Sequence, residues 1–375
     1  MNIKNIDSPE MRSWLALSHV NISISKLQHF FENYSSITDL FELSEKQLQS
    51  LGFRQGLKEK LGSIDDARLE QDLAWFDSEN KHLLPYTSHD YPPLLREIDS
   101  APKILFVHGQ KEVLKQHQIA IVGSRNPTPQ GKDNAIEFAR TLGKAGAVIT
   151  SGLALGVDGF AHQSVLDKGL PTIAVAGTGL DRVYPARHKT MAQKIVENGA
   201  LVSEFAIGTG VRATHFPARN RIISGMSLGT LVVEAAVKSG SLITARLAME
   251  QGREVFAIPG SIHNPLARGC HALIKQGVKL VETAEEIIEE LSALAIWQNE
   301  SLLQPEKDTN KAVEGFTLDK EYQELIEHID YDTTSMDCIV ERTGLEIDVV
   351  SHMLLLLELN DHIVSVAGGY QRRSS

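Results

Sequence analysis

Residues 215–259 read HFPARNRIISGMSLGTLVVEAAVKSGSLITARLAMEQGREVFAIP and contain, in order, a basic cluster, an apolar run and a loop of small residues. Arg219 and Arg221 belong to the basic cluster, and the apolar run at residues 230–233 predicts a buried strand. The loop at residues 238–241, KSGS, opens the next predicted helix. Guanidinium groups and the free N–H groups of a helix start both attract negative charge. The segment therefore predicts an anion site, and a nucleic-acid backbone is the ligand we expect.

From residue 104 onward, short apolar runs alternate with helix-length segments. The runs predicted as strands are residues 119–122, 147–150, 172–176, 200–202, 230–233, 254–258 and 278–281. The segments predicted as helices are residues 132–145, 158–168, 188–198, 242–251 and 269–276. Continuous apolar strands joined by helices are typical of a parallel sheet covered on both faces. The predicted fold class is α/β, with an extended Rossmann-like parallel sheet.

Gly, Ser and Thr recur directly after these strands, where a backbone must approach a ligand closely. The loops read GSRN at residues 123–126, SGLALGVD at 151–158, GTGLD at 177–181 and KSGS at 238–241. Ligands of open α/β sheets bind outside the carboxyl ends of the strands, so loops that follow different strands share one edge. Their composition predicts a phosphate site at that edge.

The first of these loops does not match a nucleotide fingerprint. It reads GSRNPTPQG rather than GxGxxG, and Arg125 occupies the turn where a pyrophosphate would contact bare backbone. No Walker loop with its lysine is present, and no acidic residue is placed for a ribose. We therefore expect no cofactor.

The candidate catalytic and metal-ligating side chains lack companions at the required spacing. No serine lies in a GxSxG nucleophile elbow, and Cys270 and His271 are adjacent without further ligands. Asp158 is interpreted as a helix N-cap and His162 as a packing residue. Glu234 could act as an acid, although an ion pair that orients the arginines is the commoner role. We predict neither an enzyme nor a metal site.

Charge is distributed unevenly along the 375 residues, whose formal net charge is −11. Residues 281–330 contain 14 acidic and 3 basic side chains, which accounts for all of this charge, whereas residues 205–280 contain 9 basic and 3 acidic ones. A local patch decides affinity for a polyanion more than the total charge does. The basic segment keeps nucleic acid as the expected partner, with scattered solvated charges as the alternative.

The composition also divides the chain into modules. We predict a small helical domain at residues 1–80, the Rossmann-like domain at 81–297, a linker at 298–315 and a winged-helix-like domain at 316–375. The helical domain is interpreted as SAM-like or helix-hairpin-helix-like, with a plain packing or protein-contact module as the alternative. Four prolines within residues 82–103 predict an extended connection along the surface of the sheet domain.

The winged-helix outline consists of three predicted helices followed by a hairpin. The helices are residues 318–329, 335–342 and 346–357, and the hairpin is residues 361–370. The third helix begins with Glu346 and Asp348 and contains no Lys or Arg. Because winged helices that read a duplex usually carry basic residues there, we expect this module to contact protein.

The cysteines and the apolar runs bear on cellular location. Cys270 and Cys338 fit neither a disulfide framework nor a metal motif, which is typical of a reduced, cytoplasmic protein. The first residues, MNIKNIDSPEMRSW, lack the apolar run of a signal peptide. No stretch approaches the length of a membrane span. A cytoplasmic location without a membrane partner is expected.

The ordered loops resemble the DNA-processing protein A family, called DprA or Smf. The motifs are GSR (123–125), SGLALGVD (151–158), AGTGLDRVYP (176–185), SEF (203–205), FPARNRIISG (216–225), VVEAAVKSGSLITA (232–245) and REVFAIPG (253–260). The resemblance implies an extended Rossmann domain that dimerises and binds single-stranded DNA with little sequence preference. It also implies loading of the RecA recombinase onto incoming DNA in natural transformation, without catalytic turnover. A contact with single-strand-binding protein is a further expectation.

The resemblance also implies which residues contact the DNA. Carried onto the matching positions, they are Gly123, Ser124, Arg125, Ser151, Gly152, Gly177, Thr178, Gly179, Phe216, Arg219, Asn220, Arg221, Lys238, Ser239, Gly240, Ser241 and Thr244. Arg212 is added as a basic neighbour whose position the motif does not determine. Phe216 is interpreted either as a ring that stacks on an unpaired base or as a core residue, and both interpretations stay open.

Two other functions remain as alternatives. Gly229 and Thr230 ahead of Glu234 resemble part of the signature of nucleoside-monophosphate phosphoribohydrolases, although Ser227 and Leu228 replace the expected diglycine. This makes a Rossmann nucleotide hydrolase the second hypothesis. The acidic residues 281–330 make a protein-interaction scaffold the third, and it is compatible with DNA binding.

Overall fold

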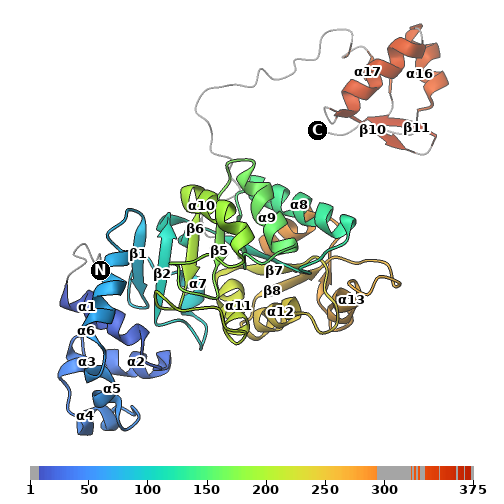
Figure 1. Ribbon diagram of the computed structural model, residues 1–375. Helices are drawn as coiled ribbons and strands as arrows, with labels where there is room; N and C mark the ends of the chain where they lie inside the picture. The colour runs from blue at the N-terminus through green and yellow to red at the C-terminus, as the bar shows by residue number, and fades with distance from the viewer. Residues whose placement is uncertain are drawn as a thin grey trace. The chain divides into compact units, whose positions relative to one another are not determined.

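The computed structural model describes residues 8–293 and, with short gaps, residues 322–372. The chain forms two compact units, residues 1–305 and 306–375, and each is described by itself (Figure 1). The predicted linker at 298–315 lies outside the described residues, and the predicted domain boundaries remain predictions. No helix within the described ranges combines the length and the apolar composition that a bilayer crossing requires.

The first unit is built around one large sheet, which in the described residues has the strand order β1-β2-β6-β5-β4-β3-β7-β8-β9. The strands are β1 (Lys81–Pro85), β2 (Ile104–Gly109), β3 (Gln118–Val122), β4 (Val148–Ser151), β5 (Thr172–Val175), β6 (Ala200–Ser203), β7 (Gly229–Val232), β8 (Glu254–Ala257) and β9 (Lys279–Leu280). Strands β3 to β9 pair in parallel, as the apolar runs predict. Strands β1 and β2 add an antiparallel edge beside β6.

Strand β3 shows how the sheet separates two cores. Ile119 and Ile121 belong to the core on one face, whereas Ala120 and Val122 belong to the core on the other. This alternation follows from the pleat, because successive side chains of a strand point to opposite faces. The predicted α/β class, with helices on both faces, is confirmed.

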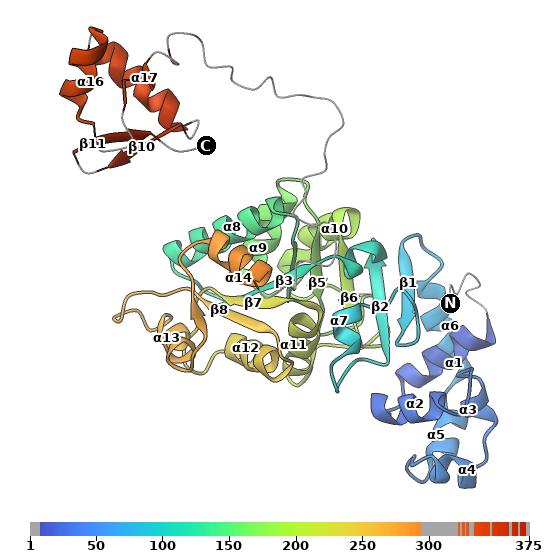
Figure 2. The ribbon, with the colours of Figure 1, turned by 180° about the vertical axis from the view of Figure 1, so that it is seen from behind.

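The helices form a layer on each face of the sheet (Figure 2). One layer consists of α8 (Pro129–Lys144), α9 (Val157–Leu166), α10 (Lys189–Asn198) and α14 (Ala284–Ala293). The other contains α7 (Pro93–Arg96), α11 (His215–Met226) and α12 (Gly240–Glu250), and α13 (Arg268–Lys275) packs beside β8. Thr128 caps α8, where its side chain accepts a hydrogen bond from the N–H of Gly131 at 3.0 Å.

Several stretches differ from what the sequence predicts. The proline-containing residues 82–103 are not a surface connection, because they contain most of β1 and all of α7, and Tyr91 and Leu95 within them are buried. The hydroxyl of Tyr91 donates to the carbonyl of Pro102 at 2.7 Å, which satisfies the polar end of the buried ring. The basic cluster after residue 214, for which no helix was expected, forms helix α11.

From residue 8 onward, where the structure describes the chain, six short helices precede the sheet. They are α1 (Pro9–Ser18), α2 (Ile24–Phe31), α3 (Asp39–Glu42), α4 (Glu45–Ser50), α5 (Leu57–Gly62) and α6 (Asp66–Trp75). Side-chain caps begin several of them, and Ser44 forms a capping box with Gln47. Their buried residues, such as Leu15 and Leu27, belong to the same apolar cluster as Phe106 of β2. The helical segment therefore packs against the antiparallel edge of the sheet.

The second unit contains α16 (Met336–Thr343), α17 (Ile347–Leu359) and an antiparallel hairpin of β10 (Ile363–Val366) and β11 (Gly369–Arg372). Its core includes Ile339, Val350, Leu354 and Ile363. The second and third predicted helices and the predicted hairpin are present. The first predicted helix, residues 318–329, and the side chains of Glu346 and Asp348 lie partly or wholly outside the described residues.

Candidate functional site

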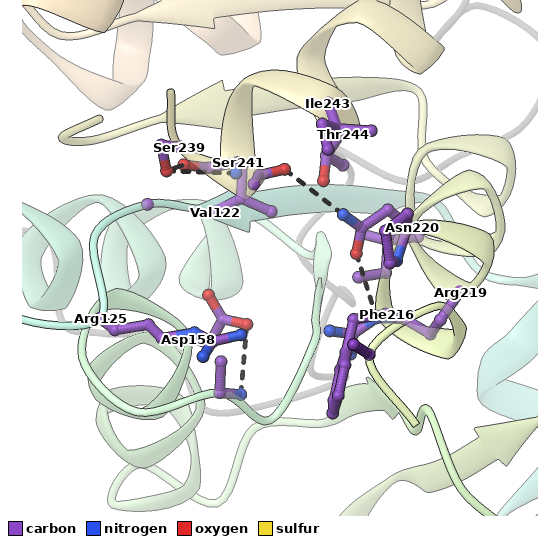
Figure 3. Close-up of a pocket in the computed structure, with 16 residues that line it drawn as sticks. Val122, Arg125, Asp158, Phe216, Arg219, Asn220, Ser239, Ser241, Ile243 and Thr244 are labelled. Atoms are coloured by element: carbon purple, nitrogen blue, oxygen red, sulfur yellow. Dashed lines mark hydrogen bonds between the residues drawn. The ribbon is translucent and has the colours of Figure 1, made fainter. Parts of the chain in front are cut away.

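The direction in which successive strands are added to the sheet reverses between β3 and β7. From β3 the chain proceeds through β4 and β5 to β6, then returns to β7 and continues outward on the other side of β3. Open α/β sheets bind ligands in the crevice outside the carboxyl ends of two such strands. A cavity of about 480 Å³ lies at this position (Figure 3). Its lining residues are Val122, Gly123, Arg125, Ala154, Asp158, Ala213, Phe216, Pro217, Arg219, Asn220, Ile223, Ser239, Gly240, Ser241, Ile243 and Thr244.

The loop after β3 places Arg125 at the cavity. Gly156, in the loop after β4, lies so close to the loop after β3 that an added Cβ would be 2.3 Å from the carbonyl oxygen of Ser124. Its φ of 80° is a second reason why the position favours glycine. The N–H of Val157 donates to that same carbonyl at 3.1 Å, so the second loop holds the first. The exposed guanidinium of Arg125 lies 6.0 Å from the centre of the Phe216 ring, at the limit of cation–π contact.

Helix α11 brings three predicted site residues to the cavity on one of its faces. Phe216, Arg219 and Asn220 are spaced i, i+3 and i+4, and all three line it. Arg221 is about 200° around the helix from Arg219, because each residue turns an α-helix by about 100°. Its Nη2 contacts the carboxylate of Glu204 at 2.5 Å, away from the cavity. The structure therefore separates two arginines that are neighbours in the sequence and were predicted to share one site.

Arg219 forms part of the cavity floor and is only 5% exposed. Its Nη1 donates hydrogen bonds to the carbonyls of Gly152 and Val175, at the ends of β4 and β5. No described residue accepts a hydrogen bond from Nη2. Burial lowers the pKa of Arg219 to about 10, and the charge of Asp158 opposes that shift. The guanidinium is therefore a charged, fixed group with one nitrogen left for a ligand.

Asp158 lines the same cavity, but it is not the N-cap that the sequence predicts. Gly156 holds the N-cap position of α9. The Oδ2 atom of Asp158 instead accepts hydrogen bonds from the N–H groups of Gly152 at 3.1 Å and Ala154 at 3.3 Å. Burial raises the pKa of Asp158, and Arg219 counteracts this effect. The aspartate thus ties the β4 loop to the start of α9 and lies beside the buried guanidinium.

The start of α12 forms the opposite wall of the cavity (Figure 3). Ser239 is its N-cap and accepts a hydrogen bond from the N–H of Ser241 at 3.3 Å. The side chain of Asn220 donates to the carbonyl of Gly240 at 3.4 Å, which links α11 to this turn. The first N–H groups of a helix have no intrahelical acceptors and carry partial positive charge. With Thr244 one turn further, this wall offers donors to an anion.

Half of the residues predicted to contact DNA do not line the cavity. Ser151 and Thr178 are buried at the strand ends. The Oγ of Ser151 donates a hydrogen bond to the carbonyl of Ile121, and the carbonyl of Thr178 accepts one from the Oγ of Ser203. Gly177 supports the Phe216 ring, whose Cδ1 would be 3.2 Å from an added Cβ. The others that lie outside the lining are Ser124, Gly152, Gly179, Arg212, Arg221 and Lys238. Lys238 and Arg212 are exposed near the lining segments.

Several lining residues are not among those predicted from the sequence. They include Asp158, predicted as a helix cap, and the apolar residues Ala213, Pro217, Ile223 and Ile243. Helical spacing within residues 215–226 could have identified Ile223, which lies seven positions after Phe216. The loop residue Ala213 carries no comparable signal.

The remaining candidates have structural roles. The carboxylate of Glu234 accepts hydrogen bonds from the backbone and hydroxyl of Thr128 at 2.9 and 2.7 Å and from Asn264 at 3.2 Å. It is absent from the cavity lining, so the predicted ion pair with the arginines is wrong and the hydrolase interpretation lacks its acid there. His162 is buried against Thr172, and burial lowers its pKa to about 3. Burial raises the pKa of the Cys270 thiol to about 11.

The crevice at the switch point and its basic lining define a Rossmann-like α/β protein with a site suited to an anionic ligand. Comparison with protein families is more specific: the model of DNA recombination-mediator protein A matches residues 82–292, and the DprA winged helix domain matches residues 310–369. The chain belongs to the DNA recombination-mediator protein A family, DprA/Smf. The predicted family and the winged-helix domain are thereby confirmed.

Individual relatives agree with this assignment. The chain is 42% identical to protein Smf of Escherichia coli K12 over 87% of its own length and 86% of that protein. The X-ray structure of DNA processing protein A from Streptococcus pneumoniae matches this chain with a TM-score of 0.67 and 38% sequence identity. The match covers 76% of this chain and 98% of the Streptococcus pneumoniae chain. A structure of DNA processing protein A from Helicobacter pylori, described for its single-stranded DNA binding mode, matches this chain with a TM-score of 0.52 and 32% sequence identity. The match covers 57% of this chain and 96% of the Helicobacter pylori chain.

Proposed function

We propose that this chain binds single-stranded DNA, with little sequence preference, in the crevice between β3 and β7. The observation that carries the proposal is the convergence of Arg125, Arg219, Phe216 and the start of α12 on one cavity. The related Helicobacter pylori protein is described as binding single-stranded DNA, which supports the same ligand.

The chemistry of the lining favours the DNA backbone over the base edges. Arg125, the Nη2 atom of Arg219 and the partial positive charge at the start of α12 suit phosphate oxygens. Contacts to phosphates position a strand without selecting its sequence. Phe216 offers a ring to an unpaired base, whereas the bases of a duplex already stack on one another. A single strand is therefore the form of DNA that satisfies both parts of the site.

The wider role belongs to the same proposal. We infer that the bound strand is passed to the RecA recombinase in natural transformation, by a cytoplasmic homodimer and without catalytic turnover. The family description as recombination mediators supports this role. A contact with single-strand-binding protein, and partner binding by residues 281–330, remain predictions. RecA filament assembly on DNA coated with single-strand-binding protein, measured with and without this chain, tests the transfer directly.

The DNA-binding proposal is tested by Arg125→Ala, because Arg125 is exposed and its removal leaves no buried gap. We expect weaker binding of every single-stranded sequence and a slope of log affinity against log salt that is reduced by about one ion. The matched control is Lys144→Ala, since Lys144 is exposed at the far end of α8, next to the amino end of β4. Titrations at several salt concentrations measure both quantities. Unchanged affinity and slope for Arg125→Ala would contradict the proposal.

A further inference from the structure

Tyr184 lies next to the cavity without lining it. It belongs to the loop between β5 and the short helix η2 (Ala186–His188), and its side chain is 47% exposed. Among the largely exposed apolar side chains of the described residues, it is the only aromatic one. Its ring centre is 5.7 Å from that of Phe216, with 46° between the planes. The exposed ring therefore continues the aromatic surface that begins inside the cavity.

The loop that carries Tyr184 is held at both ends. On one side, the N–H of Gly179 donates to the carbonyl of Thr209 at 3.0 Å, and Asp181 Oδ1 accepts from the N–H of Gly208 at 2.8 Å. On the other side, His188 Nδ1 lies 2.9 Å from the carbonyl of Leu153. A binding residue on a supported loop loses less conformational freedom when a ligand arrives.

The charges beside Tyr184 include one available cation. Arg182 forms an ion pair with the carboxylate of Asp181 at 2.7 Å. Arg187 is exposed, and no described carboxylate forms an ion pair with it. An exposed guanidinium three residues from an exposed ring is the combination that single-strand-binding surfaces use, with the ring for a base and the cation for a phosphate.

The distance between the two rings determines how bases could occupy them. A base inserted between two parallel rings needs a separation of about 7 Å, twice the ~3.4 Å repeat of stacked bases. Phe216 and Tyr184 are closer than this and are tilted, so they contact each other directly. Two neighbouring bases of one strand would therefore lie on separate rings rather than between them.

We propose that Tyr184 is a second base-stacking residue, which receives the nucleotide next to the one at Phe216 and directs the strand out of the crevice over the β5 loop toward Arg187. This inference rests on the proposed function, because it extends the same binding site. It adds a residue that the cavity lining does not include.

The test compares Tyr184→Ala with Tyr184→Phe, which keeps the ring. For oligothymidylate of 20 nucleotides, Tyr184→Ala should bind about fivefold more weakly or worse, the loss that corresponds to one stacked base, and Tyr184→Phe should stay within about twofold of the parent. A 20-mer with abasic sites throughout should bind the parent and Tyr184→Ala equally, because no base is left to stack.

The outcomes separate this inference from the function on which it rests. If the parent binds oligothymidylate and Tyr184→Ala binds it equally well, the stacking role is wrong and the DNA-binding proposal survives. If the parent binds no single strand, both are wrong. Tyr184→Trp supplies a spectroscopic readout: its additional tryptophan emission should be quenched by oligothymidylate and not by the abasic strand, and equal responses to the two would overturn the proposal.

Discussion

The crevice between β3 and β7 and the region where the N-terminal helices meet the sheet both contain arginines, but they use them differently. Within the N-terminal helices, Arg12 of α1 pairs with Glu70 of α6 at 2.7 Å, and where these helices approach the sheet Arg221 pairs with Glu204 at 2.5 Å. At the crevice, no described carboxylate forms an ion pair with Arg125. A positive charge is available to a polyanion only where no internal carboxylate already occupies it. Counting basic residues along the chain therefore overestimates the positive charge that the site offers to a ligand.

The largest expected effect concerns Arg219, which belongs to the crevice but also supports the fold. Arg219→Ala would leave the carbonyls of Gly152 and Val175 without their donor and Asp158 without its neighbouring cation. Removing one member of a buried charged group costs about 3–5 kcal/mol. We expect the free energy of unfolding, measured by urea titration, to fall by an amount in that range.

The control for this prediction is Arg125→Ala, which removes an arginine from the same crevice and should change unfolding by no more than about 0.5 kcal/mol. If the two variants lost the same free energy of unfolding, Arg219 would not support the fold, and its assignment to both the crevice and the fold would be wrong.

The next effect is a pH dependence of stability in the region where the N-terminal helices meet the sheet. Lys103 donates a hydrogen bond to the carbonyl of Val20, and burial lowers its pKa from 10.5 to about 8. Between these two values the unfolded chain binds a proton that the folded chain has released, so stability rises as pH increases from about 8 to 10.5. The contribution is at most about 3 kcal/mol, at 1.36 kcal/mol per pKa unit.

Lys103→Met should remove this contribution while keeping the length of the side chain. Urea unfolding of both proteins at intervals from pH 7 to about 10 measures the difference, since other groups that titrate are common to the two. Parallel pH profiles for the parent and Lys103→Met would show that the Lys103 ammonium is not affected by burial.

The smallest expected effect sharpens the contrast within α11. Arg221→Ala breaks a partly exposed ion pair with Glu204, which should cost about 1 kcal/mol of stability. Affinity for single-stranded DNA should stay within about twofold of the parent, because the side chain faces away from the cavity. A loss as large as that of Arg125→Ala in the same titration would mean that DNA reaches the other side of α11, and the single-crevice description would fail.

Most of the sheet could be predicted because its strands are continuous apolar runs bounded by glycine. Strands β3 to β8 follow largely from local pattern, since a parallel strand buried on both faces is rich in apolar residues. Helix α11 was missed because its apolar residues, Ile222 and Ile223, are preceded by arginines and by Pro217, which lies in the first turn, where proline is tolerated. Without the helix, the opposite directions of Arg219 and Arg221 could not be inferred.

By itself, the sequence determined the α/β class, the composition of the loops at the carboxyl ends of the strands and the family to which the chain belongs. These depend on short-range patterns, in which each apolar run or motif is complete within a few residues. Only the tertiary structure decided that Arg125, Phe216, Arg219 and the start of α12 share one cavity and that Arg221 does not. Those relations join Arg125 to residues 91 or more positions away, and they depend on strand order and helix rotation, which no local pattern specifies.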